Sequence, residues 1–499
     1  MTDAILGIDL GTTEVKAGLV GLDGRLLGIA RAGYGLDVGR GPGWAEQDPG
    51  AWWSAVVGAV RAIHRSEAGG AGATGGPGPT GGPGATSIDI VAIGVDGHGP
   101  TLVPVDQRGE ATRPAITFLD TRAAAEAADL EAATGIRGWD LGPLPAALWM
   151  ERHEPAAAAR TRWYLSTWEW LAFRLTGEAV APLVSDQIVP DPATVAAATG
   201  LHVQRRPPVG RLGEITGRLT GAAADALGLQ PGIPVAGGTN DAFASYLGAG
   251  LLEPGDAFDP GGAAGGFGVY WHEPLVVAGA FVTPAPLAGL FSVGAAMAAT
   301  GRALDWFRDD VIGGAITTER LIEEAAATAP GADGLVFLPY LAGERSPIWD
   351  PGATGVLAGL TLAHGQGHIA RAILEASALA LRHVSSSMLA AGVTVTAMRA
   401  CGGPARSETW NQVKADVTGF RVLVPAVLET GVVGSAILGA VGIGVQPDLP
   451  TAIRAMTTID HELEPRPEFA ATYDRIYAAY TALYPAVAPV LGPMTAAAR

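Results

Sequence analysis

The chain has 499 residues, of which 48% are hydrophobic, and it carries a formal net charge of −17. This length exceeds what one ordinary hydrophobic core serves, so the sequence predicts two large domains. A surface this acidic repels nucleic-acid backbones and anionic membranes, so neither is an expected partner. The single cysteine, Cys401, excludes an intrachain disulfide and fits a cytoplasmic protein. We expect no signal peptide, and no apolar run reaches the ~18 residues that a membrane span needs.

The N-terminal segment predicts a β-meander. Residues 4–9 and 15–20 are short apolar runs on either side of a polar turn at 10–14, and a third run follows near 25–30. Apolar runs joined by short turns are typical of antiparallel hairpins rather than of a strand–helix–strand unit.

A low-complexity insertion interrupts the first domain. Residues 51–66 have helical spacing and residues 88–96 form an apolar strand pattern, whereas 68–86 between them is almost entirely Gly, Ala, Pro and Thr. A segment of this composition cannot bury a core, so we predict a flexible surface insertion there.

The turn of the first hairpin has the composition of a phosphate-binding loop. Gly11 allows close approach to the backbone, and Thr12 and Thr13 supply hydroxyl donors. Lys16, one of only two lysines in the chain, supplies a cation. Asp9 at the end of the first strand can hold Mg²⁺ directly or through water. For this segment alone, an ordinary polar β-turn is the alternative interpretation.

Two common nucleotide motifs are missing from the sequence. The chain has no Gly-Lys pair and therefore no Walker A loop, and no G-x-G-x-x-G fingerprint follows the first strand. P-loop and dinucleotide-binding enzymes are therefore disfavoured. The hairpin instead resembles the phosphate loop of the actin-like ATPase superfamily, which includes sugar kinases, chaperones, actin and acetate kinases.

A second candidate site lies at 237–241. The strand pattern at 233–240 runs into a glycine-rich turn, and Asp241 is expected to open a helix. A carboxylate at such a junction can point into a cleft and accept the proton of a hydroxyl during phosphoryl transfer. A plain helix N-cap is the alternative, because Asp is a preferred capping residue.

The second half of the chain repeats the pattern of strands, glycine turns and helices. A glycine-rich stretch spans 259–268, and a strand–loop–helix passage runs through 397–418. We therefore predict an α/β fold of two related domains, at 1–246 and 247–499, on either side of a cleft.

Three long motifs and the last helix resemble the FGGY family of carbohydrate kinases. They are 334–350 (GLVFLPYLAGERSPIWD), 359–382 (GLTLAHGQGHIARAILEASALALR), 401–416 (CGGPARSETWNQVKAD) and the aromatic-rich stretch 469–484. The resemblance covers nearly the whole chain. It implies two actin-like (ribonuclease H-like) domains flanking a central cleft, with the sugar on the N-terminal side and the nucleotide on the C-terminal side.

The same resemblance implies a set of site residues. Asp241 matches the catalytic base and, with Asp9, a Mg²⁺ site, while Gly262 falls in a second phosphate loop. In the motif at 401–416, a glycine pair would let a nucleotide approach the backbone, and the serine that follows it can cap the next helix. The residues expected at the adenine-nucleotide site are Gly402, Gly403, Ala405, Ser407 and Gln412.

The expected sugar side departs from the family pattern. Where xylulose kinases read similarly to G-x-S-G-Q-M-H-G-L, this chain has GVDGHGPTL at 94–102, with His98 in place of the Gln. In a W-x-D-x-R element, Phe118 replaces the Trp, while Asp120 and Arg122 remain, either as sugar ligands or as a buried ion pair. The candidate substrate-binding residues are His98, Gly99, Phe118, Asp120, Arg122 and Asn240.

The second phosphate loop departs as well. Its usual pattern resembles Gly-Thr-Ser-Gly, but residues 262–265 read Gly-Ala-Ala-Gly, so both hydroxyls are missing while the backbone NH groups remain. We expect weaker phosphate binding at this loop, or an acceptor that reaches deeper.

Together these patterns predict an ATP-dependent kinase for a small sugar or polyol, with a ketose such as a pentulose preferred and Mg²⁺ as cofactor. Whether the enzyme is a homodimer stays open. A non-catalytic sugar- and nucleotide-binding sensor on the same fold is the alternative, and the altered 262–265 loop favours it. A chaperone- or filament-type ATPase is a third possibility, for which the chain shows no appended peptide-binding domain.

Overall fold

The computed structural model of the chain describes residues 2–39, 41, 43–67, 88–184, 191–262 and 264–497. The predicted surface insertion at 68–86 and Ala263 of the second phosphate loop lie outside these residues.

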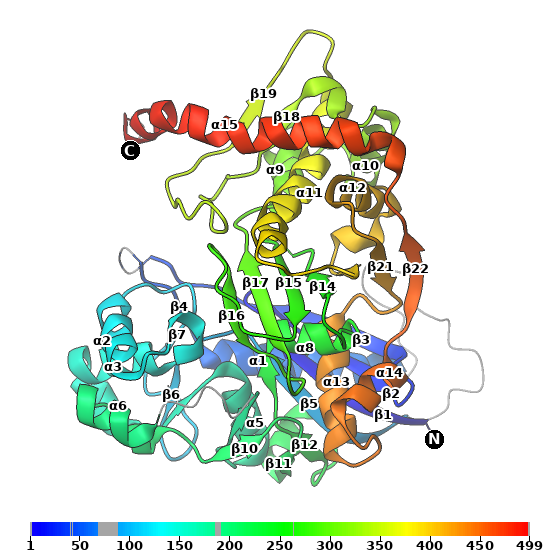
Figure 1. Ribbon diagram of the computed structural model, residues 1–499. Helices are drawn as coiled ribbons and strands as arrows, with labels where there is room; N and C mark the ends of the chain where they lie inside the picture. Colours follow the sequence, from blue (N-terminus) through cyan, green and yellow to red (C-terminus); the bar gives the residue numbers. More distant parts are fainter. Residues whose placement is uncertain are drawn as a thin grey trace. The chain divides into compact units, whose positions relative to one another are not determined.

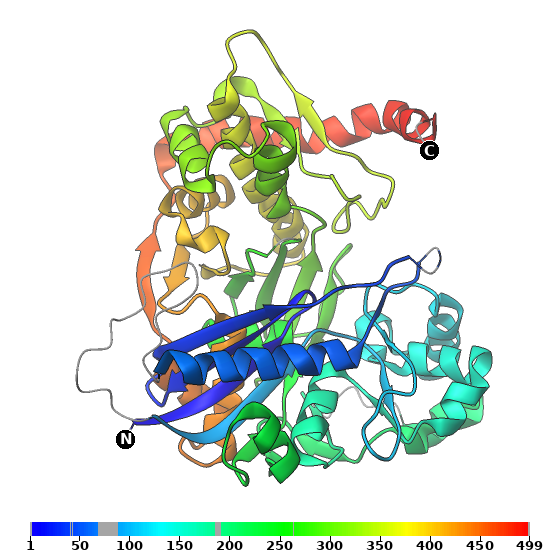
Figure 2. The same cartoon turned by 180° about the vertical axis from the view of Figure 1, so that it is seen from behind.

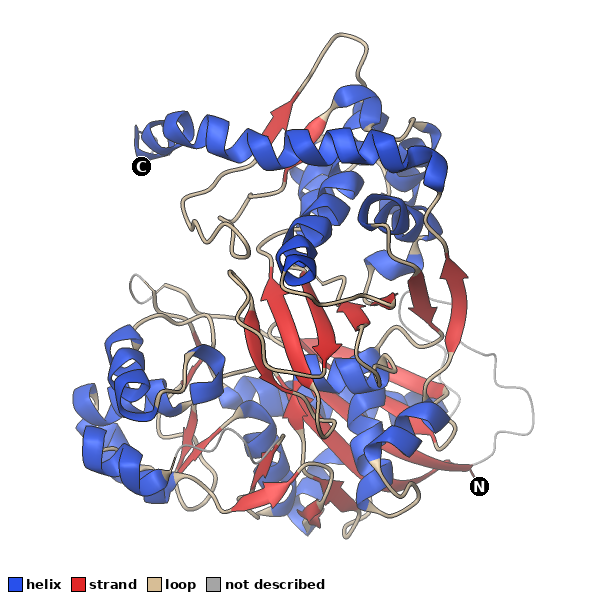
Figure 3. Cartoon of the chain, in the orientation of Figure 1, coloured by secondary structure: helices blue, strands red, loops and turns tan. Residues whose placement is uncertain are grey.

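The chain forms two compact units, here called unit 1 and unit 2. Their composition is as follows: Met1–Gly250, Pro284–Ala288 and Glu429–Thr458 make up unit 1, and Leu251–Thr283, Gly289–Leu428 and Ile459–Arg499 make up unit 2. The single boundary predicted at 246/247 did not include the return of Glu429–Thr458 to unit 1. In both units strands and helices mix, as the fold prediction required (Figure 3).

Unit 1 is built on a sheet with the strand order β11-β12-β5-β1-β2-β3, and β13 also pairs with β5. The predicted β-meander is confirmed, since β1, β2 and β3 pair antiparallel in sequence. The strands and helices of unit 1 are β1 (Thr2–Leu10), β2 (Glu14–Gly21), β3 (Leu26–Gly33), β4 (Glu46–Gln47), α1 (Pro49–Glu67), β5 (Ile88–Gly97), β6 (Val103–Val105), β7 (Ala115–Ile116), α2 (Ala124–Thr134), α3 (Leu144–His153), α4 (Pro155–Arg160), β8 (Trp163–Leu165), α5 (Thr167–Thr176), β9 (Ala181–Leu183), α6 (Pro192–Thr199), β10 (Val209–Arg211), β11 (Ile215–Arg218), α7 (Gly221–Leu227), β12 (Pro234–Ala236), β13 (Thr239–Asn240), α8 (Asp241–Gly248), α13 (Thr430–Gly442) and α14 (Leu449–Met456).

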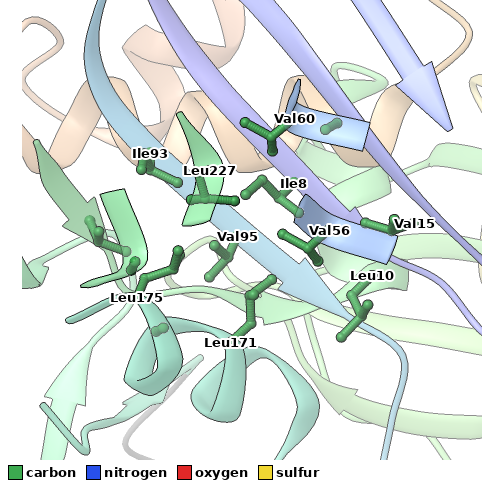
Figure 4. Packing of buried hydrophobic residues seen from close by; sticks show 14 of the residues in the cluster. Ile8, Leu10, Val15, Val56, Val60, Ile93, Val95, Leu171, Leu175 and Leu227 are labelled. Carbon is green, nitrogen blue, oxygen red and sulfur yellow. The ribbon is translucent and has the colours of Figure 1, made fainter. Parts of the chain in front are cut away.

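One face of the unit 1 sheet is covered by α1, the long blue helix in Figure 2. Because side chains alternate along a strand, Ile8 and Leu10 of β1 share this face. They join a buried cluster with Val56 and Val60 of α1 and with Val95 of β5 (Figure 4). The apolar runs of the sequence therefore supply the core on this face of unit 1.

The opposite face is covered by α13, which contacts β1, β5 and α8 (Figure 1). The helix lies directly on the strands, because a Cβ atom at Gly7 would overlap the carbonyl oxygen of Val432, and one at Gly94 would overlap that of Ser435. Two residues further along the same face, β1 carries Asp9 and β5 carries Asp96. The glycines thus bring the N-terminal half of α13 onto two strand ends that carry carboxylates.

Unit 2 has a sheet of order β16-β17-β15-β14-β20-β21-β22. Its central strand β14 pairs antiparallel with β15 and parallel with β20, just as β1 pairs with β2 and β5 in unit 1. The elements of unit 2 are β14 (Asp256–Asp259), β15 (Gly266–Trp271), β16 (Phe281–Pro284), β17 (Phe291–Ala296), α9 (Arg302–Trp306), α10 (Thr318–Ala327), β18 (Val336–Leu338), β19 (Val356–Ala358), α11 (Gln366–Ala390), β20 (Ala397–Ala400), α12 (Glu408–Thr418), β21 (Val422–Pro425), β22 (Ile459–Leu463) and α15 (Ala470–Ala497). This shared pairing bears out the prediction of two related α/β domains.

Among the described residues, no helix is both long and apolar enough to cross a lipid bilayer.

The close packing of α13 can be tested at Gly94. We expect Gly94→Ala to lower the free energy of unfolding by about 2–3 kcal/mol, because the added methyl group must displace the backbone at Ser435. Gly58→Ala is the matched control, since Gly58 is an exposed helical position where a Cβ meets nothing within 4 Å. That control should be neutral or slightly stabilising. Equal urea midpoints for the two variants would contradict the packing of α13 described above.

Candidate active site

The β1–β2 turn presents hydrogen-bond donors that have no partner in the described part of the chain. The carbonyl oxygens of the turn are occupied, since Gly11 O accepts from the Tyr34 hydroxyl, Thr12 O from Gln47 Nε2 (2.8 Å) and Thr13 O from Tyr34 N (3.0 Å). In contrast, the amides and hydroxyls of Thr12 and Thr13 bond to no other described residue. This is the arrangement that an incoming phosphate group requires.

Asp9 lies at the end of β1, 6% exposed, and is the acidic neighbour of this turn. Lys16 Nζ lies 3.3 Å from Asp9 Oδ2. The carboxylate of Asp9 raises the pKa of Lys16, and Glu429 adds to the effect, so the ammonium remains charged. A Cβ atom at Gly431 would stand 2.8 Å from Asp9 Oδ2, so the first turn of α13 lies directly against the carboxylate. The positive end of a helix stabilises a negative charge placed there.

Asp96 is a site residue that the sequence analysis missed. It pairs in register with Asp9 across β1 and β5, is fully buried, and accepts a hydrogen bond from Ser435 Oγ on Oδ2 (2.6 Å). Its Oδ1 has no partner among the described residues. Burial, with a further contribution from the charge of Asp9, raises the pKa of Asp96 well above its usual value. A polar residue within the buried strand pattern at 88–96 was the available signal.

Asp241 opens α8, as predicted. The capping role of the alternative interpretation belongs to Asn240, whose Oδ1 accepts from Phe243 N (2.8 Å), while Asp241 Oδ1 accepts from Ala242 N (2.8 Å). Asp241 is half-buried. Burial and the charge of Asp9 raise the pKa of Asp241 to about 7. A role for Asn240 in substrate binding stays a prediction.

The strand register brings these groups to one edge of the sheet. β13 pairs parallel to β5, with Thr239 opposite Asp96 and Asn240 opposite Gly97. Asp241 and His98 therefore follow directly after paired positions. Ligands of α/β proteins bind at the carboxyl ends of parallel strands, which is where these residues lie.

His98 is completely buried in an aromatic setting. Its ring lies 5.3 Å from the Trp52 ring and 6.0 Å from the Phe118 ring, measured between centroids. Thr101 Oγ1 lies 3.1 Å from Nδ1, whereas Nε2 has no partner among the described residues. Burial lowers the pKa of His98 to about 3, so the imidazole is neutral. At Gly99 a Cβ atom would stand 2.8 Å from the Trp168 ring, so a larger residue there would have to displace that ring.

Asp120 and Arg122 form the buried ion pair that the sequence analysis considered as one alternative. Their side chains are 0% and 3% exposed, and Arg122 Nη2 lies 2.5 Å from Asp120 Oδ2. Arg122 also donates to Glu46 Oε1 (2.8 Å) and stacks on Trp44 at 3.5 Å. These contacts fix the segment that carries Phe118. Direct sugar binding by Asp120 and Arg122 stays a prediction.

Unit 2 contains a pocket of about 250 Å³, a volume that includes the open solvent at its mouth. It joins Gly262 of the second phosphate loop to Pro404 of the predicted nucleotide motif. Its lining residues are Asp259, Gly261, Gly262, Met297, Thr300, Gly301, Ser377, Leu381, Pro404, Trp410 and Lys414.

Four of the predicted nucleotide residues lie between β20 and α12, namely Gly402, Gly403, Ala405 and Ser407, whereas Gln412 lies within α12. Gly402 adopts φ = 68°, and a Cβ atom there would stand 2.6 Å from Pro260 O, so glycine is required. Ser407 caps α12, as expected, by accepting from Trp410 N (3.1 Å). Nothing lies within 4 Å of a Cβ built on Gly403, whereas Ala405 is buried at 2% exposure.

Gln412 is engaged within the protein. Its Nε2 donates to Asp416 Oδ1 and to Glu464 O, each at 2.9 Å. Contact of Gln412 with a nucleotide stays a prediction.

The C-terminal model of the FGGY family of carbohydrate kinases matches residues 265–443, and the N-terminal model matches residues 4–187. The chain belongs to this family. It is 32% identical over 437 residues to the xylulose kinase of Escherichia coli K12, covering 83% of this chain and 84% of that protein. It is 26% identical to the gluconokinase of Bacillus subtilis, covering 89% of this chain and 88% of that protein.

The solved structures agree with this assignment. The crystal structure of xylulose kinase from Rhodospirillum rubrum matches with a TM-score of 0.78 and 30% identity, over 98% of this chain and 99% of that one. The chain is therefore a sugar kinase with the two-domain actin-like α/β fold, and its family implies that it uses ATP.

The raised pKa of Asp241 predicts a pH-dependent stability. Because its folded-state pKa of about 7 exceeds the unfolded value, the folded protein binds the extra proton between the two values, and stability falls as pH rises toward 7. Asp241→Asn does not titrate, so its stability advantage over the unmodified protein should grow by about 1–2 kcal/mol between pH 5 and pH 8. Urea denaturation without added metal or nucleotide measures the difference. Asp225→Asn, at an exposed position of α7, is the control and should show no such growth.

Proposed function

We propose that this sugar kinase transfers the γ-phosphate of ATP to a hydroxyl group of an uncharged ketose or polyol, with Asp241 as the general base. One observation carries the proposal. A carboxyl group with a pKa of about 7 lies at the same sheet edge as the β1–β2 turn, where the amides and hydroxyls of Thr12 and Thr13 have no partner among the described residues. A base with this pKa can accept a proton near neutral pH and release it again.

The residues of unit 1 divide the work between phosphate and acceptor. In this proposal the amides and hydroxyls of Thr12 and Thr13 bind phosphate oxygens, and Lys16 adds positive charge beside them. Asp241 accepts the proton of the attacking hydroxyl at Oδ2, because Oδ1 already accepts a hydrogen bond from Ala242 N. Since phosphoryl transfer has little covalent chemistry for the protein to perform, positioning and charge neutralisation supply most of the rate.

Mg²⁺ fits the donor set of unit 1. Asp9 and Asp241 offer carboxylate oxygens, and Mg²⁺ is commonly bound by one or two carboxylates together with substrate phosphates. When bound, the ion neutralises charge on the phosphates.

The charges near His98 favour an uncharged acceptor. The edge already carries the carboxyl groups of Asp9, Asp96 and Asp241. In the segment that carries Phe118, the buried guanidinium of Arg122 is already paired with Asp120 and Glu46. A carboxylate on the substrate would therefore add a further acidic group to an edge that already holds three, whereas a hydroxyl can bond to the neutral His98 Nε2. The named activities of the relatives include both kinds of acceptor, a ketose and an aldonate.

The general base is tested by Asp241→Asn. We expect the variant to lose about 10²–10⁴-fold in kcat for phosphorylation of the best pentulose, because no other group replaces the proton acceptor. ADP release in a coupled assay measures the rate, and Asp225→Asn provides the control. ATP binding should persist in the variant. Unchanged turnover would remove Asp241 from this role, and binding of ATP and sugar by the unmodified chain without any transfer would favour the sensor alternative.

The acceptor class is tested with xylulose, ribulose, xylitol and gluconate. We expect kcat/KM for the best uncharged acceptor to exceed that for gluconate by about 100-fold or more. His98→Phe should raise the sugar KM by about tenfold, since a buried hydrogen bond is lost, and should leave the ATP KM within about twofold. His202→Phe, at an exposed histidine of unit 1, is the control. Preference for gluconate would contradict the charge argument.

A further inference from the structure

The chain contains only two lysines, and each forms an ion pair with the aspartate that ends a central strand. In unit 1, Lys16 pairs with Asp9 at the end of β1. In unit 2, Lys414 Nζ lies 2.5 Å from Oδ2 of Asp259, at the end of β14. The two aspartates hold equivalent places, because β1 and β14 each lie between an antiparallel and a parallel neighbour. Lys16 comes from the adjacent strand, whereas Lys414 comes from α12.

Asp259 connects this lysine to the second phosphate loop. Its Oδ1 accepts a hydrogen bond from Gly261 N (3.0 Å), and its main-chain oxygen accepts one from Cys401 N (3.0 Å). Gly261 adopts φ = 54°, and a Cβ atom there would overlap Cys401 O. Asp259 therefore fixes the turn that leads into Gly262 through its carboxylate, while its main-chain oxygen bonds to the residue that follows β20.

The ion pair is isolated from solvent. Lys414 is 2% exposed and Asp259 is 3% exposed. Neither Lys414 Nζ nor Asp259 Oδ2 has another polar partner among the described residues. Removing one member of a buried pair leaves a charge without compensation, so the other member must move or change its protonation. Loss of Lys414 would therefore disturb the same carboxylate that accepts the hydrogen bond from Gly261 N.

The composition of the loop makes this dependence important. Residues 262–265 carry no side-chain hydroxyl, so the backbone amides are the donors that remain for phosphate. Amide donors act well only when their directions are fixed before the ligand arrives. Asp259, Gly261, Gly262 and Lys414 all line the unit 2 pocket.

We propose that Lys414 is a positioning residue for nucleotide binding, which acts through Asp259 to hold the Gly261–Gly262 turn in the conformation that binds the phosphate groups of ATP. This inference rests on the proposed function. It assigns to a buried lysine of α12 the ordering of a loop that lacks the usual hydroxyl ligands.

The test compares Lys414→Met with the unmodified enzyme. We expect the variant to raise the Kd of ATP and of ADP by about tenfold or more and to leave the Kd of adenosine and the KM of the sugar within about twofold. Calorimetric titration with each nucleotide gives the affinities. A uniform loss of affinity for all ligands would mark a general structural defect and would overturn the proposal.

A second pair on the same strand supplies the control. Arg399 Nη1 lies 2.7 Å from Asp256 Oδ1, and both side chains are 12% exposed. Asp256 begins β14, at the opposite end from the loop. Arg399→Met therefore removes a largely buried ion pair of the same sheet without touching the turn. If it weakens ATP binding as much as Lys414→Met does, the proposal is wrong.

The double variant Lys414→Met/Asp259→Asn separates positioning from direct charge. The amide that replaces the Asp259 carboxylate is neutral and can still accept the hydrogen bond from Gly261 N. Positioning therefore predicts recovery of ATP affinity to within about threefold of the unmodified enzyme. No recovery would mean that the phosphates use the ammonium charge itself, which overturns the positioning role.

A replacement variant and the nucleotide affinity of the unmodified chain complete the test. If Lys414→Met does not fold, Lys414→Gln takes its place, since it keeps a donor for Asp259 without the charge, and the same pattern of affinities is expected. If the unmodified chain binds neither ATP nor ADP, the proposed function fails. If it binds both and Lys414→Met binds them equally well, only the role of Lys414 fails.

Discussion

The site of unit 1 depends on the contact between α13 and the face of β1 and β5 that carries glycine. A side chain at Gly7 or Gly94 would overlap the backbone of the helix and force it away from the sheet. With the glycines in place, the start of the helix reaches Asp9, and Ser435 reaches Asp96. The same backbone contact thus sets both the packing of the unit and the surroundings of its carboxylates.

Three carboxyl groups at one sheet edge repel one another when ionised. Their negative charge must be offset by positive charge nearby or removed by protonation. Lys16 and the N-terminus of α13 supply part of it at Asp9. Asp96 and Asp241 respond instead through raised pKa values, so they hold protons that an exposed carboxyl group would release. Gathering these carboxyl groups lowers the stability of the fold. Such a loss, together with raised pKa values, is typical of functional sites.

Local patterns were sufficient for much of this architecture. The hairpin, α1, β5 and the helix opened by Asp241 follow from apolar runs, turn residues and spacing, all of which lie within a few residues of each other. Ser407 as the cap of α12 belongs to the same class.

The features that the sequence did not predict are non-local. The bond between Ser435 and Asp96 joins residues 339 positions apart, and nothing near either residue signals it. The same holds for the assignment of Glu429–Thr458 to unit 1. Arg122 was ambiguous because a motif cannot show whether a guanidinium is already paired, whereas the contacts with Glu46 and Trp44 show that it is.

The late return of α13 also constrains how the protein is made. During synthesis β1 and β5 leave the ribosome long before residues 429–458. The sheet face that carries the glycines and carboxylates therefore lacks α13 while most of unit 2 is synthesised. The nascent N-terminal half is therefore an incomplete body, exposed to chaperones, proteases and mispairing until nearly the whole chain has been translated. The packing of α13 against Asp9 arises only at that last stage, so the surroundings of this carboxylate depend on a segment that is translated late.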